Sequence, residues 1–76
     1  MTTAHRRVGV LRGSDRGTCL VPGLLLKTDG NMVEVLIEQD GGTVVERTCR
    51  AYADTPLPET AARWQEHYQR LEAANN

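Results

Sequence analysis

Aromatic side chains are scarce in this chain of 76 residues, which has no Phe and only Trp64, Tyr52 and Tyr68 as rings. Base stacking on single strands of nucleic acid needs exposed rings, so the strands offer little for that mode of binding. The core must instead consist mainly of aliphatic side chains, which suit a β-rich fold. Because a chain this short buries only about 60% of its unfolded surface, a second copy or a partner protein would add to a marginal core.

Long apolar runs are absent as well. No window contains the roughly 18 apolar residues of a membrane-spanning helix, and the basic N-terminal segment is not followed by the apolar run of a secretory signal. We therefore expect a cytoplasmic protein. Its only cysteines are Cys19 and Cys49, and in the cytoplasm we expect two buried thiols rather than a disulfide.

The residues that carry out catalysis or bind metals are few and widely spaced. Ser14 is the only serine, and no Gly-x-Ser-x-Gly motif surrounds it. The potential metal ligands His5, Cys19, Cys49 and His67 include no closely spaced pair of the kind found in zinc sites. The glycine clusters join or follow strands and do not open a helix, as a phosphate-binding loop does. We expect no enzyme, no metal and no cofactor.

Charge is divided unevenly along the chain. Residues 1–27 carry five cations and one anion, whereas residues 28–76 carry four cations and nine anions. A basic segment on a small barrel is a platform for RNA or single-stranded DNA. The residues that would make these contacts are Arg6, Arg7, Arg12, Arg16 and Lys27. The alternative is an ordinary solvated segment.

The clearest structural pattern is LLLKTDGNMVEVLIEQDGGTVVERT, residues 24–48. Asp-Gly pairs at 29–30 and 40–41 predict two tight hairpin turns. With two-residue loops at the Asp-Gly pairs, Leu26 pairs with Val33, Leu24 with Val35, and Ile37 with Val44. A turn at Gly-Asn or Gly-Gly instead would move the pairing by two residues and keep every residue on the same face. One face of the sheet then forms a core: Leu24, Leu26, Val33, Val35, Ile37 and Val44.

The opposite face of these strands mixes polar and apolar residues. Leu25, Glu34 and Arg47 are expected to align across three strands, with Leu36 beside Val45 and Met32 beside Cys49. This face has more apolar residues than a solvated surface needs, so it is a candidate docking surface for a protein partner. Its candidate contact residues are Leu25, Met32, Leu36 and Arg47.

An earlier strand and a later helix complete the predicted elements. The segment RRVGVLRG places Val8 and Val10 on one side of a strand, and Pro22 suits a strand edge better than a central position. At the other end, prolines, Glu59 and a cap at Asp54 or Thr55 signal a helix entry. A stripe at helical spacing follows: Leu57, Ala61, Trp64, Tyr68 and Leu71.

Two features of the predicted helix concern function. Trp64 and Tyr68 are residue types that anchor protein interfaces; the alternative is that they fill the space between helix and sheet. His67 lies between Arg63 and Arg70 on one side of the helix. These three residues form either a basic stripe for an acidic partner or phosphate, or a solvated flank.

Together these patterns predict an α+β, mainly β fold for one small domain over residues 1–76. It has a flexible tail at 1–5, an antiparallel sheet at 6–52 and one amphipathic C-terminal helix at 57–74. The sheet is a meander of three to five strands, or a partly open barrel like Src-homology-3 or oligonucleotide-binding domains. The predicted function is non-catalytic protein binding, as an adaptor, an inhibitor or a homodimer, through the mixed face or the helix.

Overall fold

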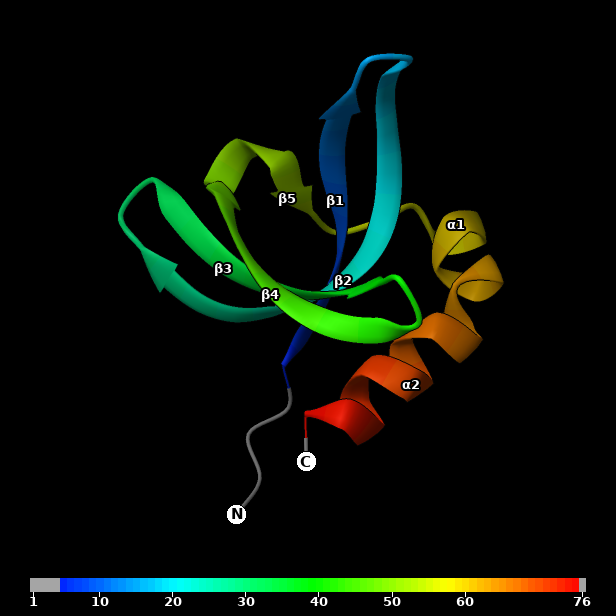
Figure 1. Cartoon of the computed structure of the whole chain (residues 1–76). Coiled ribbons are helices and arrows are strands. Elements are labelled where there is room, and N and C mark those ends of the chain that lie inside the picture. The colour runs from blue at the N-terminus through cyan, green and yellow to red at the C-terminus, as the bar shows by residue number, and fades with distance from the viewer. Residues whose placement is uncertain (1–4, 76) are drawn as a thin grey trace.

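The computed structural model describes residues 5–75, which form a five-stranded antiparallel sheet and two consecutive helices (Figure 1). The predicted tail lies, apart from His5, outside the described residues. The elements are β1 (Arg6–Ser14), β2 (Gly17–Asp29), β3 (Met32–Gln39), β4 (Gly42–Cys49), the 3₁₀ turn η1 (Arg50–Tyr52), β5 (Ala53–Asp54), α1 (Pro58–Arg63) and α2 (Gln65–Ala74). The strand order is β4-β3-β2-β1-β5, so the predicted α+β meander with a C-terminal helix is confirmed.

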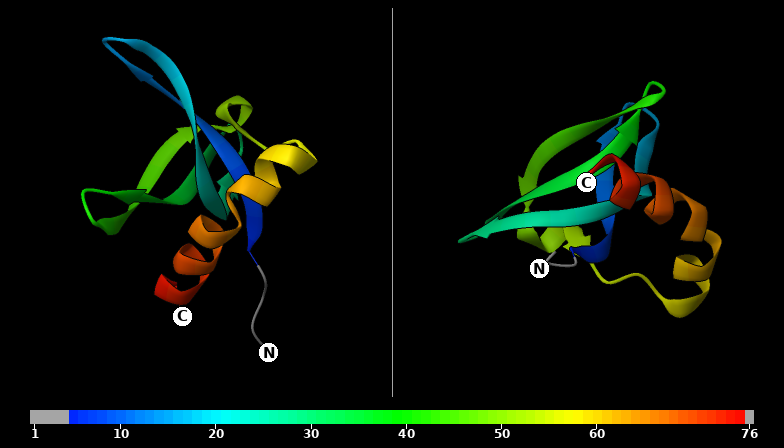
Figure 2. Two further views of the ribbon diagram at one scale, coloured as in Figure 1. Left: turned by 90° about the vertical axis from the view of Figure 1, so that its right-hand side faces the viewer. Right: turned by 90° about the horizontal axis from the view of Figure 1, so that it is seen from below.

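The sheet is strongly curled, yet it does not close into a barrel (Figure 2). The chain returns from β4 through η1 to β5, which pairs with β1 only at Gly9 and Val10. With two residues, β5 is too short to close the seam between β1 and β4. The barrel form of the prediction is therefore not reached, and β4 and β5 are the edges of an open sheet.

The second hairpin has the predicted register and the first does not. Ile37 pairs with Val44, and Glu34 with Arg47, as expected. In the first hairpin the turn is Gly30–Asn31, because Asp29 pairs with Met32. The register between β2 and β3 then shifts at Leu26, between Leu25 and Lys27. Neighbouring strand residues point to opposite faces, so this irregularity moves the β2 residues before Leu26 to the face opposite the predicted one.

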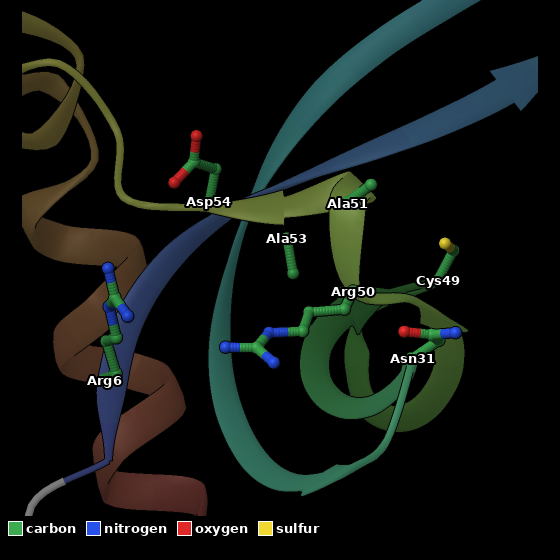
Figure 3. Close-up of a pocket in the computed structure, with 7 residues that line it drawn as sticks. All are labelled: Arg6, Asn31, Cys49, Arg50, Ala51, Ala53 and Asp54. Carbon is green, nitrogen blue, oxygen red and sulfur yellow. The ribbon is translucent and has the colours of Figure 1, made fainter.

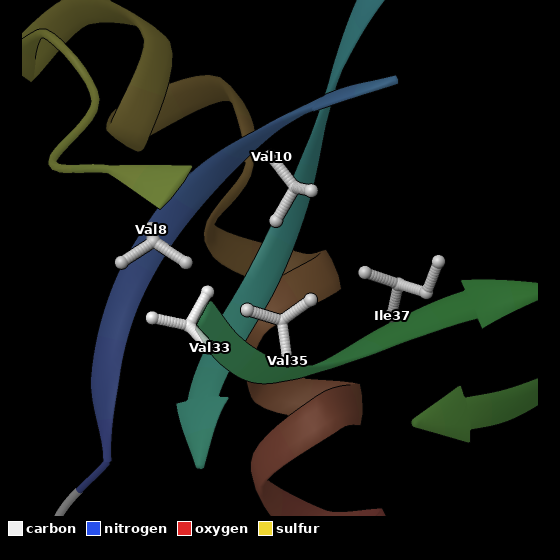
Figure 4. Close-up of a cluster of buried hydrophobic side chains, with 5 residues drawn as sticks. All are labelled: Val8, Val10, Val33, Val35 and Ile37. Atoms are coloured by element: carbon white, nitrogen blue, oxygen red, sulfur yellow. The ribbon is translucent and has the colours of Figure 1, made fainter. Parts of the chain in front are cut away.

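The concave face of the curled sheet holds one hydrophobic core, centred on β1 and β3 (Figure 4). Its five buried members are Val8, Val10, Val33, Val35 and Ile37. Leu25 packs against them, whereas the sequence placed Leu25 on the opposite face. Val44 was predicted to belong to this core but is 39% exposed, because it lies on the edge strand where the sheet ends.

The helix packs on the other face, the one predicted to be mixed. Leu24 and Leu36 are buried there against Tyr68 and Leu71 of α2. Leu26 and Trp64 lie at the margin of this cluster. The predicted face assignment was thus wrong for Leu24 and Leu26 as well as for Leu25. The curl of the sheet buries the valine face, which leaves the helix to cover the other one.

The predicted single helix is two helices that meet at Trp64, whose φ of −96° and ψ of 8° depart from helical values. The residue before α1 is Leu57, which has no side-chain cap and is 72% exposed. The predicted cap at Asp54 or Thr55 is therefore wrong: Asp54 Oδ1 instead accepts a hydrogen bond from the Thr55 amide at 2.8 Å. Pro58 occupies the first turn, as expected.

The expectations for Pro22 and the cysteines have mixed outcomes. Pro22 pairs with Gly9 of β1, and β2 pairs with β3 only from Gly23 onward. Pro22 thus has a strand on one side only, as an edge proline should. Both cysteines are free thiols, but Cys19 is exposed and Cys49 is partly exposed, so neither is buried as predicted.

In the part of the chain that the structure describes, neither helix has the length and apolar character needed to cross a membrane.

Candidate functional site

The six predicted contact residues for a protein partner do not form one surface. Tyr68 and Leu36 are buried beneath α2, and Trp64 is half-buried beside them. Leu25 packs in the concave core. Only Met32, half-buried, and Arg47, exposed, remain on the accessible part of the predicted face. The geometry supports the alternative interpretation of Trp64 and Tyr68, in which they fill the space between helix and sheet.

Tyr68 also has polar contacts that fasten the helix to β1. Its hydroxyl donates a 2.8 Å hydrogen bond to the carbonyl oxygen of Val8, and burial raises the Tyr68 pKa to about 12. The Arg7 guanidinium lies 5.2 Å from the centre of the Tyr68 ring. Arg7 Nη2 is also 2.7 Å from Glu72 Oε1, and this hydrogen bond lowers the pKa of Glu72.

The predicted nucleic-acid contacts are dispersed, and at least three of them, Arg6, Arg7 and Arg12, are engaged within the chain. Arg7 reaches α2 on one face of the sheet, as described above. Arg12 forms a 2.8 Å ion pair with Glu46 of β4, and Arg6 donates a hydrogen bond to Thr55 Oγ1. Arg16 lies in the turn after β1, and Lys27 is exposed on β2. These five residues make no continuous basic surface.

The basic stripe predicted around His67 has an acidic partner inside the chain. Glu38 of β3 accepts a 2.8 Å hydrogen bond from Arg70 Nε and lies 2.8 Å from His67 Nδ1. Arg70 first, and His67 second, lower the Glu38 pKa to about 2. Arg63 precedes the helix break at Trp64 and belongs to α1. This cluster links α2 to β3, and the side chains of Arg70 and His67 are directed at Glu38.

The free edge of β4 is the first candidate binding feature. Within the described chain β4 pairs with β3 alone, and over eight residues it contains no proline. Val44 and Val45 are 39% and 56% exposed on its two faces. A groove of about 280 Å³ lies between the second half of β4 and the outer end of β1. Its lining residues are Leu11, Arg12, Gly13, Glu46, Arg47, Thr48 and Tyr52.

The second candidate is a pocket of about 580 Å³ at the end of the sheet where β4 turns into η1 (Figure 3). The lining residues come from the start of β1, the β2–β3 turn, the end of β4, η1 and β5, and they are Arg6, Asn31, Cys49, Arg50, Ala51, Ala53 and Asp54. The Arg50 amide donates a 2.7 Å hydrogen bond to the Asn31 carbonyl oxygen, which joins η1 to the β2–β3 turn. The Arg50 side chain extends from there toward Arg6 (Figure 3).

No group of three or more potential metal ligands occurs among the described residues. Comparison with known proteins gives no further indication, because no protein family, no curated protein and no solved structure matches this chain. A functional assignment therefore rests on the two candidate features alone.

Neither feature was predicted from the sequence, although the predicted second hairpin contains a signal for part of the second one. In that hairpin Met32 lies beside Cys49, which brings Asn31 near Arg50. The approach of Arg6 and β5 to these residues depends on the curl of the sheet. No local pattern encodes that curl.

Proposed function

We propose that this protein is a non-catalytic protein-binding module that docks through the free edge of β4, and that its partner there is a second copy of the chain. The observation that carries the proposal is the edge itself. Eight residues present backbone N–H and C=O groups without a strand on one side, and such an edge is a template for pairing with another chain. Native edges are commonly protected by prolines, bulges or inward-pointing charges. On β4 the charge of Glu46 is paired with Arg12, there is no proline, and exposed valines lie at the centre of the strand.

The side chains of β4 favour symmetric antiparallel pairing with Val45 at the centre. In such a pair, one residue lies opposite its own copy, and opposed side chains share a face. A centre at Glu46 or Arg47 would oppose like charges. With Val45 at the centre, the exposed valines of the two copies lie opposite each other. Thr43 of each copy then lies opposite Arg47 of the other, and residues 42–48 of the two strands pair along their whole length.

The size of this contact predicts a weak dimer. Stable specific interfaces bury about 1,200–2,000 Å², and a single pair of eight-residue strands buries less. We expect dissociation constants on the order of 10–100 μM, in the range of small transient interfaces. Such a dimer would extend the sheet without using the residues that hold α2 in place.

Analytical ultracentrifugation from low to high micromolar concentration tests the proposal. The wild-type mass should rise from one chain toward two. The substitution Val45→Lys places two ammonium groups opposite each other at the symmetry centre of the dimer. Their repulsion should raise the dissociation constant at least tenfold. Leu57→Lys is the matched control, because it makes the same kind of change at an exposed apolar residue beside α1. A single-chain mass for the wild type at high micromolar concentration contradicts the dimer.

Binding of RNA or single-stranded DNA remains the alternative, and the contacts described above weaken it. Arg7 and Arg12 would have to leave Glu72 and Glu46 before contacting phosphates. We therefore do not propose it as a second function.

A further inference from the structure

The pocket beside η1 is lined by two arginines, Arg6 and Arg50. Elsewhere, Arg7, Arg12, Arg47 and Arg70 each have a carboxylate within 4 Å, whereas Lys27 and Arg63, which form no ion pair among the described residues, lie outside the pocket. Among the residues that the structure describes, no carboxylate forms an ion pair with Arg6 or Arg50. Both line this one pocket. Positive charge without an internal counter-charge is therefore concentrated in a concavity.

The remaining polar groups leave that charge available. Arg6 donates to the Thr55 hydroxyl, which is a neutral acceptor. Asp54 is the only acidic lining residue; its Oδ1 accepts the Thr55 amide, and its carboxylate lies on the other side of β5 from the Arg50 guanidinium (Figure 3). Ala53, whose side chain is a single methyl group, lies on the side of β5 that the Arg50 side chain occupies (Figure 3), so little side-chain volume fills that space.

We propose that this pocket binds the phosphate group of a small ligand between Arg6 and Arg50. A guanidinium group presents a planar fork of donors that matches two oxygens of an oxyanion. A carboxylate has two oxygens, so two guanidinium forks must share the same pair. A phosphate group has at least three, so two guanidinium groups on different elements, β1 and η1, can each bind a different pair of oxygens.

The other lining residues restrict the rest of the ligand. A volume of about 580 Å³ lies within the ~300–1,000 Å³ typical of small-molecule sites, so it holds more than a phosphate group. No aromatic residue lines the pocket, so a nucleobase has no ring to stack on. Asn31 and Asp54 offer hydrogen-bonding groups at the margin. The ligand class is therefore a small, non-aromatic phosphate ester such as a phosphorylated polyol.

NMR titration of the full chain tests this proposal, using ¹H–¹⁵N signals of the backbone and of the arginine Nε–Hε groups. Sodium phosphate, sodium acetate and glycerol 3-phosphate are added separately at constant ionic strength and neutral pH. We expect phosphate to shift the signals of Asn31, of residues 49–54 and of the Arg6 and Arg50 side chains. Phosphate should bind at least tenfold more tightly than acetate, and glycerol 3-phosphate at least as tightly as phosphate on the same signals.

Arg50→Gln provides the matched variant, because it removes one guanidinium group from an exposed side chain. It should raise the dissociation constant for phosphate at least tenfold. Arg63→Gln, at an exposed arginine of α1 outside the pocket, should change it less than twofold. Equal binding of acetate and phosphate, shifts centred elsewhere, or an unchanged affinity in Arg50→Gln each overturns the proposal. The wild-type shifts test the proposal even if a variant fails to fold.

Discussion

The Tyr68 hydroxyl in α2 donates a buried hydrogen bond to the carbonyl oxygen of Val8 in β1, across 2.8 Å and 60 residues of sequence. Val8 belongs to the concave core and Tyr68 to the core beneath the helix. This one bond therefore connects the two hydrophobic clusters on opposite faces of the sheet. It also fixes the position of α2 relative to β1.

Tyr68→Phe should lower the free energy of unfolding by about 1–2 kcal/mol, because the change removes the buried hydrogen bond from the Tyr68 hydroxyl to the Val8 carbonyl oxygen while preserving the ring. Tyr52→Phe is the control, since Tyr52 is exposed, and it should stay within about 0.5 kcal/mol of wild type. Urea denaturation measures both. Equal stability of the two variants would show that the hydrogen bond contributes nothing.

A graded effect is expected from alanine at three glycines of the β1–β2 hairpin. A Cβ at Gly23 would lie 2.9 Å from Val10 Cγ2, and one at Gly9 would lie 3.3 Å from Leu20 Cδ2 and Trp64 Cζ3. At Gly13 a Cβ meets nothing within 4 Å. Gly23→Ala should therefore destabilise by about 1–3 kcal/mol through overpacking, Gly9→Ala by less, and Gly13→Ala not at all. Thermal or urea unfolding gives the order, and a Gly13 variant as unstable as the Gly23 variant contradicts it.

Leu24 of the predicted sheet core and Leu57 of the predicted helix stripe should differ sharply in their contribution to stability. Leu24 is fully buried against α2, so Leu24→Ala should cost about 2–5 kcal/mol. Leu57 is 72% exposed, so Leu57→Ala should change stability by less than about 0.5 kcal/mol. The same denaturation measurement compares them. If Leu57→Ala were as costly as Leu24→Ala, the stripe predicted from the sequence would extend through α1 after all.

Acid should weaken the contact between α2 and β3. The Glu38 pKa of about 2 lies below its ordinary value of 4.5, so ionised Glu38 favours the folded state. That stabilisation is complete above about pH 4.5 and is lost as the pH falls toward 2. Because Glu38 is 32% exposed and Arg70 is 52% exposed, solvent screening limits it to about 1 kcal/mol.

Glu38→Gln should remove this part of the pH dependence. The stability difference between wild type and Glu38→Gln should be largest at neutral pH and should shrink between pH 4.5 and 2. Glu34→Gln is the control on the same strand, because Glu34 forms no ion pair among the described residues. Urea denaturation at a series of pH values measures the difference. A constant gap across this range would be incompatible with the Arg70–Glu38 contact.

The sequence by itself determined the local elements of this protein. Asp-Gly pairs and alternating valines were enough to predict the second hairpin and its register, because two-residue turns allow few geometries. The proline-rich entry and the 3.6-residue periodicity were enough to predict a C-terminal helix. These signals act between residues that are close in sequence, so no knowledge of the whole fold was needed.

Tertiary structure alone decided which face the helix covers and which residues form the candidate binding features. The register shift at Leu26 exchanged the faces of Leu24 and Leu25. It depends on how β2 bends so that it can pair with β1 on one side and β3 on the other. The curl of the sheet buried the valine face, brought Arg12 to Glu46, and placed Arg6 and Arg50 around one pocket. Such contacts between distant segments arise from the twist of the whole sheet, which no short stretch of sequence encodes.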